Sequence, residues 1–330
     1  MITIGVLGCG AIGCKHLLAL KSLQQQIPLS VTAFADARRE ARNQSLKIWP
    51  EAKAYSDAGE LIENERMDLL YICLPSYLHT AYAVMAMRRK IGVFIEKPVC
   101  LTAAEAELLL AEQQKNNAFA AVGQVLRFFH EYEYLHKLIR TGIYGELKFL
   151  VLKRLCGRSK AWFQEEEKSG SVVLDLHIHD VDFIRHAIGE PEIKMVTGRA
   201  GDTGMITHII TEYTCGTTQM AAEGLWDISG AVPFEAGYRA YFEEASVVYD
   251  SVRVETPVIY EADNIVEWQA ADNLQNPYQK ESKYLLTCFL KKQEPIRISL
   301  AEGIKSAKLC RQELELAKQF VHNNYSGGLL

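Results

Sequence analysis

Apolar and polar residues alternate in one way up to about residue 122 and in another way beyond it. In the first part, short apolar runs typical of strands lie near residues 2–7, 30–35, 69–74, 92–95 and 119–122, and helical patterns lie between them near residues 12–25, 38–48, 79–90 and 103–117. Thr102 and Glu105 have capping-box spacing, which predicts the start of the last of these helices. Strands that alternate with helices are typical of a parallel sheet covered on both faces. Residues 1–122 are therefore predicted to form a doubly wound α/β domain.

After Gly123 the stretches become longer, and apolar residues recur at every second position. These stretches cover residues 146–155, 206–214, 217–226, 234–242 and 252–261, and two helical patterns follow near residues 278–291 and 299–322. The pattern is typical of antiparallel strands with one covered face. Residues 123–330 are therefore predicted to form an α+β domain with a large, mainly antiparallel open sheet, whose last residues, 326–330, fray.

The predicted open sheet has a second face that must be covered or solvated. Its strands carry apolar residues on both phases in places. Helices of the same chain or a second copy of the chain would cover such a face, and the sequence leaves both alternatives open. We expect a homo-oligomer, a dimer or a tetramer, that forms through this sheet.

Charge and composition exclude several classes of partner. The formal net charge is −5, and the 23% of charged residues are mixed in sign, so the chain lacks the basic stripe that a nucleic-acid backbone requires. No apolar run approaches the ~18 residues of a membrane span, and Met1 precedes the first predicted strand too closely for a secretory signal. The eight cysteines are scattered without a C-x-x-C pair, as reduced thiols are. We expect a cytoplasmic protein.

A G-x-G-x-x-G motif lies between the first predicted strand and the first predicted helix. Gly8 permits a tight turn, Gly10 has no side chain to block a phosphate, and Gly13 lets the helix pack close to the strand. The helix N-terminus would then face an anion. Because Asp36 ends the next predicted strand, the motif has the context of a Rossmann dinucleotide fingerprint. The alternative is a glycine-rich corner that binds nothing.

Asp36 also bears on which nicotinamide cofactor is bound. A carboxylate there would accept hydrogen bonds from the adenosine ribose and repel a 2′-phosphate, which favours NAD. Arg38 and Arg39 follow closely, and their guanidinium groups could cradle that phosphate, so NADP stays possible. The alternative for both arginines is a solvated first turn of a helix.

Two further polar clusters directly follow predicted strands. Pro75, Ser76 and His79 follow one strand, and Glu96 and Lys97 follow the next. The carboxyl ends of parallel strands are where doubly wound sheets bind ligands, so both clusters are predicted to line one crevice. An ordinary loop and a solvated surface lysine are the alternatives.

A third cluster, near residues 169–182, contains histidines and carboxylates in a helical pattern. On a helix Asp175, His179 and Asp182 share one face, whereas His177 points nearly opposite. A carboxylate one turn from an imidazole can fix its tautomer and support acid–base chemistry near neutral pH. A helix-surface Asp–His pair without chemistry is the alternative.

In this order, the clusters resemble the glucose-fructose oxidoreductase / inositol dehydrogenase (Gfo/Idh/MocA) family over nearly the whole chain. The segments that carry the resemblance are G-C-G-A-I-G-C-K-H at residues 8–16, P-S-Y-L-H at 75–79, E-K-P at 96–98, V-G-Q-V-L-R-F at 122–128, and D-x-x-x-H at 175–179. The resemblance implies an NAD(P)-dependent dehydrogenase that acts on a sugar, cyclitol or related polyol. It also implies that Lys97 contacts the nicotinamide and the reacting hydroxyl, that Asp175 orients the substrate and that His179 takes the proton.

The resemblance and the motifs together predict the site residues. Those that would bind the cofactor are Gly8, Gly10, Ala11, Ile12, Gly13, Asp36, Arg38, Pro75, Ser76, His79, Glu96 and Lys97. Those that would bind the substrate are Lys97, Arg127, Trp162, Asp175 and His179. Guanidinium donors and aromatic faces both suit sugars, although Arg127 and Trp162 could equally serve packing or a surface salt bridge.

The chain departs from the family pattern at three positions. Gly170-Ser171 stands where many relatives have two glycines, His177 replaces the usual small residue between the Asp and the His, and Ser76 stands where relatives often have Asn. The first two changes put the shape of the loop and the choice of substrate in doubt. A serine hydroxyl can still form a hydrogen bond.

Three other functions remain alternatives. A metal-dependent hydrolase would use His177, His179 and Asp182 as ligands, but on a helix the two histidines cannot converge on one ion, and we predict no metal site. A non-catalytic dinucleotide sensor could use the same fold. A glycosidase that oxidises its substrate transiently with tightly held NAD would show no net reduction of the cofactor.

Overall fold

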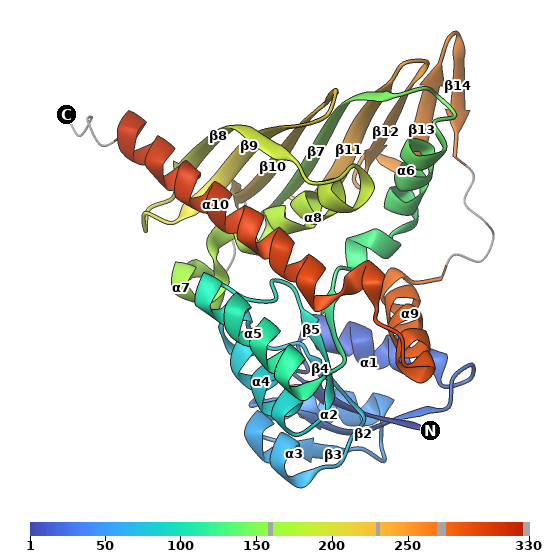
Figure 1. The fold of residues 1–330 in the computed structure, drawn as a ribbon, viewed down its shortest axis with the longest axis vertical. Helices are drawn as coiled ribbons and strands as arrows, with labels where there is room; N and C mark the ends of the chain where they lie inside the picture. The colour runs from blue at the N-terminus through green and yellow to red at the C-terminus, as the bar shows by residue number, and fades with distance from the viewer. Residues whose placement is uncertain (158–160, 229–231, 269–274, 326–330) are drawn as a thin grey trace. The chain divides into compact units, whose positions relative to one another are not determined.

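A computed structural model describes residues 1–157, 161–228, 232–268 and 275–325 of the chain (Figure 1). The chain forms two compact units. The first comprises Met1–Phe128 and Gln275–Lys305, and the second comprises Phe129–Leu274 and Ser306–Leu330. The sequence pattern indicated a change of architecture at residues 122/123 but not the return of residues 275–305 to the first unit. The predicted frayed tail, 326–330, lies outside the described residues.

The first unit is built on a six-stranded sheet in the order β3-β2-β1-β4-β5-β6, in which every neighbouring pair is parallel. The strands are β1 (Ile2–Leu7), β2 (Leu29–Ala35), β3 (Lys53–Tyr55), β4 (Leu69–Ile72), β5 (Gly92–Glu96) and β6 (Ala120–Gly123). The prediction of a doubly wound parallel sheet is confirmed. The short strand β3 was not predicted, because three residues are too few to show a period.

Helices cover both faces of this sheet. Those of the first unit are α1 (Ala11–Leu23), α2 (Arg39–Ile48), α3 (Ala58–Asn64), α4 (His79–Arg88), α5 (Ala103–Asn116) and α9 (Pro277–Lys291). Helices α3, α4 and α5 lie on one face, and α1, α2 and α9 on the other (Figure 1). The predicted capping box is present, since Thr102 Oγ1 accepts from the Glu105 N–H at 3.1 Å and Glu105 Oε2 accepts from the Thr102 N–H at 2.9 Å.

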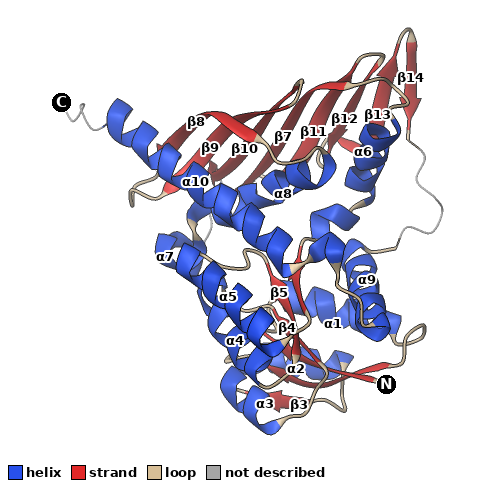
Figure 2. Cartoon of the chain, in the orientation of Figure 1, coloured by secondary structure: helices blue, strands red, loops and turns tan. Residues whose placement is uncertain are grey.

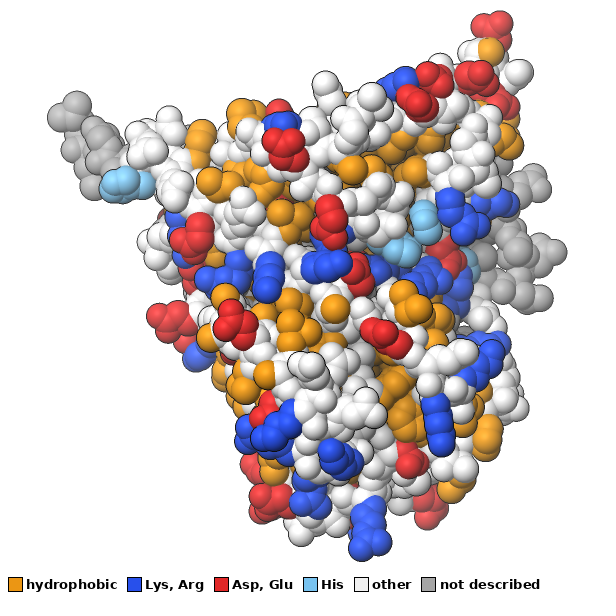
Figure 3. All heavy atoms as spheres, viewed as in Figure 1, with side chains coloured by type: hydrophobic (Ala, Val, Ile, Leu, Met, Phe, Trp, Pro, Cys, Tyr) orange, Lys and Arg blue, Asp and Glu red, His pale blue; other side chains and the backbone are white. Residues whose placement is uncertain are grey.

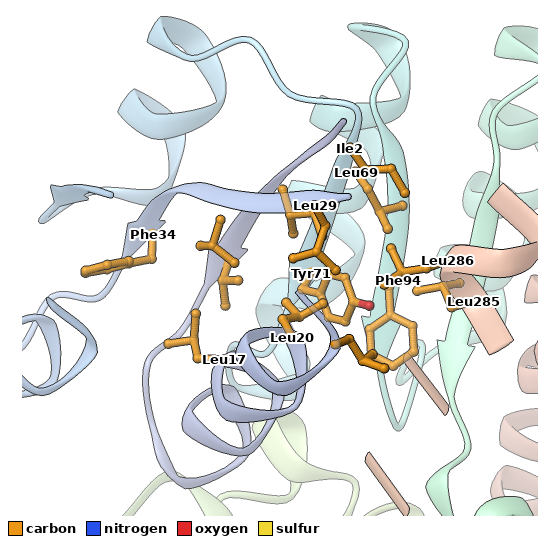
Figure 4. Packing of buried hydrophobic residues seen from close by; sticks show 14 of the residues in the cluster. Ile2, Leu17, Leu20, Leu29, Phe34, Leu69, Tyr71, Phe94, Leu285 and Leu286 are labelled. Carbon is orange, nitrogen blue, oxygen red and sulfur yellow. The ribbon is translucent and has the colours of Figure 1, made fainter. Parts of the chain in front are cut away.

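The core of the first unit explains why α9 belongs there. Leu17 and Leu20 of α1 pack with Tyr71 of β4, and Leu285 and Leu286 of α9 complete the same cluster, as Figure 4 shows. The two leucines of α9 are fully buried. Burying each contributes about 1.5–3 kcal/mol, which keeps α9 on the sheet although about 150 residues of chain separate it from β6.

The second unit contains an eight-stranded sheet in the order β14-β13-β12-β11-β7-β10-β9-β8. The strands are β7 (Leu147–Gly157), β8 (Glu192–Ala200), β9 (Ile206–Cys215), β10 (Thr218–Ile228), β11 (Glu235–Phe242), β12 (Ala245–Asp250), β13 (Val254–Glu261) and β14 (Asn264–Glu267). All neighbouring pairs are antiparallel except β7 and β10. The predicted large, mainly antiparallel sheet is confirmed, although the pattern indicated neither β8, β12 nor β14.

Helices of the second unit lie on one face of its sheet (Figure 2). They include α6 (His130–Thr141), α8 (Ile178–Ala187) and the part of α10 (Leu300–Tyr325) beyond Lys305, and α7 (Glu166–Ser169) is a single turn. Buried Leu150 and Leu152 of β7 point to this helical face. The next residues along β7, Phe149 and Val151, point to the opposite face, which we call the outer sheet face, and both are half-buried.

Surface charge and hydropathy add two facts about the described residues. Lys and Arg side chains are interspersed with Asp and Glu side chains over the visible surface of each unit (Figure 3). No helix in the described ranges is long and apolar enough to cross a membrane. The eight cysteines, all of which lie in those ranges, form no disulfide.

Candidate active site

The glycine-rich corner between β1 and α1 has the geometry that its motif predicts. Gly8 has φ +85°, and a Cβ at that position would lie 2.4 Å from the Cys73 carbonyl oxygen. A Cβ on Gly13 would lie 1.9 Å from the Gly8 carbonyl oxygen, so only glycine lets α1 approach the loop this closely. At Gly10 the nearest atom to such a Cβ is 3.5 Å away, on Arg38, which leaves the backbone open to a phosphate. The corner therefore fits a dinucleotide.

Helix α1 begins at Ala11 and Ile12, directly after Gly10. No side chain caps it. The N–H groups of its first turn and the positive end of its dipole are therefore suited to an anion.

Asp36 follows β2 and lies against the glycine-rich loop. Its Oδ2 accepts from the Cys9 N–H at 2.9 Å and from Arg38 Nη2 at 3.0 Å, and its Oδ1 accepts from Arg38 N at 2.9 Å and Nε at 3.1 Å. Burial alone would raise the pKa of this carboxyl, but the hydrogen bonds from Arg38 and Cys9 hold the pKa below its usual value. These four bonds occupy its acceptor positions, so a ribose hydroxyl would have to displace the exposed Arg38 side chain.

His79 is the first residue of α4 and is buried between two loops. Its Nδ1 lies 2.8 Å from the Pro98 carbonyl oxygen, and its Nε2 lies 2.7 Å from the Leu74 carbonyl oxygen. Burial lowers the pKa of His79, against the effect of the two carbonyl groups, and a neutral ring donates to only one of them. His79 therefore links the loop after β4, which contains Pro75 and Ser76, to the loop after β5.

Glu96 ends β5, and its carboxylate is held inside the first unit. Oε1 lies 2.7 Å from His16 Nε2, and Oε2 accepts from the Lys97 N–H at 3.0 Å. Burial would raise the pKa of Glu96, but the hydrogen bond and charge of His16, together with the charge of Lys97, hold the pKa below its usual value. The half-buried Lys97 side chain thus extends from a fixed main-chain position at the carboxyl end of β5.

Two predicted substrate contacts lie in local clusters. Arg127 is 3% exposed and donates from Nη1 to the Arg297 carbonyl oxygen, while Arg297 donates to the Arg127 carbonyl oxygen. Trp162 is half-buried and stacks on Phe163, with ring centroids 3.9 Å apart. Arg127 therefore ties chain segments within the first unit, and Trp162 presents part of an aromatic pair in the second.

Asp175 and His179 lie on either side of a change in helix type. Residues Val173–His177 form a π-helical turn, and α8 begins at Ile178. Asp175 and His179 are both half-buried. Asp182, which was predicted to share their face, is buried and accepts from Ser306 Oγ of α10 at 2.8 Å. The π turn lies between Asp175 and His179, so a 3.6-residue period does not give the relative phase of these two residues, whereas His179 and Asp182 both lie on the regular helix α8.

Two protein-family models match the sequence of this chain. The model of an oxidoreductase family with an NAD-binding Rossmann fold matches residues 2–124, and the Gfo/Idh/MocA C-terminal domain matches residues 132–243. The chain belongs to the Gfo/Idh/MocA oxidoreductase family. The predicted family is confirmed, and so is its nicotinamide dinucleotide cofactor.

Individual relatives in the Gfo/Idh/MocA family catalyse different reactions. The chain is 25% identical over 269 residues to myo-inositol 2-dehydrogenase from Thermotoga maritima, which covers 78% of this chain and 77% of that one. It is 26% identical over 211 residues to 2,7-anhydro-N-acetylneuraminate hydratase from Escherichia coli, covering 62% and 55%. Levoglucosan dehydrogenase, solved with NADH and levoglucosan, shares the fold with a TM-score of 0.85 at 16% identity, covering 97% and 98%.

His177, the departure from the Gfo/Idh/MocA pattern, is a core residue. Its ring is fully buried, with Nε2 3.2 Å from the Tyr213 hydroxyl and 3.2 Å from Glu313 Oε2 of α10. Tyr213 also donates to Glu313 Oε1 at 2.6 Å. His177 thus links the π turn to β9 and α10. Among the described residues no three His, Cys, Asp or Glu side chains gather in a way that would hold a metal ion.

Sequence reasoning missed His16, which belongs to the first motif but received no role. A signal was present, because His16 precedes Leu17 and Leu20 on the side of α1 that becomes buried. A histidine on such a face requires a polar partner, and the sequence could not identify Glu96 as that partner.

Proposed function

We propose that this protein is a dehydrogenase that oxidises a CH–OH group of a sugar, a cyclitol or a related polyol with a nicotinamide cofactor. The observation that carries this proposal is the retention of Lys97, Asp175 and His179 in a chain whose glycine-rich corner fits a dinucleotide. A protein that only senses dinucleotides has no need of these three groups together.

Each of the three residues has a distinct chemical role in the proposal. The bound nicotinamide supplies a hydride acceptor. The Lys97 ammonium stabilises negative charge on the reacting oxygen, and His179 accepts the proton that leaves the hydroxyl group. Asp175 accepts a hydrogen bond from the substrate and orients it.

The substrate class follows from the relatives and from the aromatic pair in the second unit. The relatives include a myo-inositol dehydrogenase and a levoglucosan dehydrogenase, and the substrates in both names are polyhydroxylated rings. The stacked Trp162 and Phe163 offer a face of the kind on which sugar rings pack. Arg127 stays in the proposal as a substrate contact only because a guanidinium group suits the hydroxyl groups of a sugar.

NAD is the preferred cofactor in this proposal. The Asp36 carboxylate repels a 2′-phosphate, and Arg38 pairs with that carboxylate in a bidentate manner. When Arg38 turns away, Asp36 accepts from both ribose hydroxyls. NADP binds more weakly, because its phosphate has to remain beside the Asp36 charge.

We further propose that the protein works in the cytoplasm as a homo-oligomer. Absence of disulfides among the eight cysteines suits a reducing compartment. The outer sheet face carries exposed Tyr241, Tyr260 and Ile265, a set of apolar side chains that a second copy would cover.

The test of the function is a screen for NADH formation with inositols, hexoses and anhydrosugars, followed by substitution of Lys97 and His179. Lys97→Ala and His179→Ala should each lower turnover by ~10² or more and leave NAD affinity within about threefold, because positioned acid–base groups contribute that much. His322→Ala, at an exposed site on α10, is the matched control. Unchanged turnover in both variants would refute the mechanism.

A second candidate, a reaction in which the substrate is oxidised only transiently, is favoured by the relative named as a hydratase. The same screen separates the two. A transient oxidation converts the substrate without accumulation of NADH, which product analysis by mass spectrometry detects.

A further inference from the structure

His16 occupies a position on α1 that favours an apolar side chain. Its ring is fully buried among three aromatic rings, with centroids 5.4 Å from Tyr71, 5.1 Å from Phe94 and 5.3 Å from Tyr278. Its Nδ1 has no hydrogen-bond partner in the described part of the chain. Burial of an imidazole with one unsatisfied nitrogen is costly, so the other nitrogen needs a compensating contact.

That contact is the carboxylate of Glu96, which three elements enclose. Helix α1 provides His16 Nε2 at 2.7 Å, the chain beyond β5 provides the Lys97 N–H at 3.0 Å, and β6 provides Gly123. A Cβ on Gly123 would lie 3.0 Å from the carboxyl carbon of Glu96, so the carboxylate occupies the space that a side chain would need. The carboxylate has little room to move.

The enclosed carboxylate fixes the main chain of Lys97 at one end of its loop. His79, through the Pro98 carbonyl oxygen at 2.8 Å, fixes the next residue. The Lys97 side chain therefore extends from a main chain that is held on both sides, and only the side-chain torsions can change. A displacement of about 1 Å in a reacting group is enough to cost ~10² in rate.

We propose that His16 and Glu96 are positioning residues for Lys97, and that their buried pair couples the helix whose N-terminus receives the dinucleotide to the lysine that acts on the substrate. His16 lies three residues beyond Gly13 on α1. A displacement of α1 toward a bound pyrophosphate is thus transmitted to the Lys97 main chain through two hydrogen bonds, one from His16 to Glu96 and one from the Lys97 N–H to Glu96. The inference rests on the proposed function, because Lys97 is its target.

A role in stability alone would not require this pair. Replacement of both members of a buried polar pair by apolar groups of similar volume is often neutral or stabilising, so a core without His16 and Glu96 is physically accessible. Glu96 also bonds to the residue proposed to carry chemistry, rather than to a distant part of the fold.

The experiment compares three variants of the whole protein. His16→Phe keeps the ring but removes the donor, His16→Gln keeps a donor that can reach Glu96, and Tyr71→Phe removes a hydroxyl from the same aromatic cluster without changing the pair. Four quantities are measured: the dissociation constant for NAD by fluorescence titration, kcat and KM with the best polyol, and the hydrogen-exchange rate of the Lys97 amide by mass spectrometry.

In His16→Phe, we expect the Lys97 amide hydrogen to exchange with solvent at least ~10-fold faster. The reason is that His16 no longer holds the Glu96 carboxylate, which accepts the hydrogen bond of that amide. The kcat of this variant should fall at least ~10-fold with NAD affinity within about threefold, and His16→Gln should recover most of both losses. Tyr71→Phe should match the unsubstituted protein. If no polyol is oxidised, the proposed function fails while the exchange data still test the pair. Unchanged exchange and kcat in His16→Phe, or no recovery in His16→Gln, would overturn the inference.

Discussion

At the scale of single residues, three buried histidines each hold a part of the chain that the sequence marks as functional. His16 holds the carboxylate beside Lys97, His79 joins two loops, and His177 anchors the turn that contains Asp175. The motifs identified these regions, and, as the motif predicts, Gly8 has a positive φ and Gly13 has no room for a Cβ. The partners of the histidines could not be predicted, because Glu313 and Tyr213 are far from His177 in sequence.

The anchoring role of His177 predicts an effect on stability. His177→Ala removes one member of a fully buried triad and leaves Glu313 without its imidazole, so the free energy of unfolding should fall by about 3 kcal/mol. Urea denaturation followed by circular dichroism measures the loss. His322→Ala, on an exposed turn of α10, should change stability by less than about 0.5 kcal/mol. Equal changes in the free energy of unfolding for the two substitutions would show that the contacts of His177 do not stabilise the fold.

Asp36 and Arg38 predict the response to cofactor. Asp36→Ala removes the charge that repels a 2′-phosphate and frees the Arg38 guanidinium, so the ratio of kcat/KM for NAD to that for NADP should fall at least ~10-fold. Glu40→Ala, at an exposed position of α2, is the control. An unaltered ratio in Asp36→Ala would show that Asp36 does not determine the preference for NAD over NADP.

At the scale of elements, most long periodic segments were predicted, whereas the short strands, strand β8 and helix α6 were not. The capping box at Thr102 placed the start of α5 correctly, because its signal is local. The π turn at Val173–His177 is stabilised by contacts with β9 and α10, so the local sequence does not predict it. For the same reason, the pattern near residues 278–291 predicted a helix but not its place beside α1.

The close approach of α1 to the glycine-rich loop gives a prediction for this element. Gly13→Ala places a Cβ against the Gly8 carbonyl, so α1 must move away, and NAD affinity should fall at least ~10-fold. Gly142→Ala has φ +62° but open space around its Cβ, so it should cost about 1 kcal/mol of stability and leave NAD affinity unchanged. Isothermal titration calorimetry compares the two variants. Retention of full affinity in Gly13→Ala would contradict the assignment of the dinucleotide to this corner.

At the scale of the whole molecule, the two architectures and the family were evident from the sequence, whereas the assembly was not. The parallel and antiparallel patterns differ in period, so the change near residue 122 was visible. Residues 275–305 join the first unit through side chains such as Leu285 and Leu286, which have no sequence signature for their destination. A charged network of Lys153, Glu235 and Asp250 also lies on the outer sheet face among apolar residues.

The outer sheet face predicts the oligomeric state. Phe149→Glu places a charge at the centre of that face, on β7, and should convert a dimer or tetramer to smaller species. Leu108→Glu changes an exposed leucine of α5 in the first unit and should leave the mass unchanged. Light scattering after size-exclusion chromatography gives the masses. A monomeric unsubstituted protein, or an unchanged mass in Phe149→Glu, would be the contrary result.

The central claim is that hydrogen passes from a carbon atom of a polyol to the nicotinamide. The most direct measurement incubates the protein with NAD and the active polyol deuterated at its carbinol carbons, and then determines the mass of the NADH by mass spectrometry. The account predicts NADH that carries one deuterium, with formation slowed ~10² or more in His179→Ala. Reduced cofactor without deuterium, or deuterated cofactor formed equally fast in His179→Ala, would contradict it.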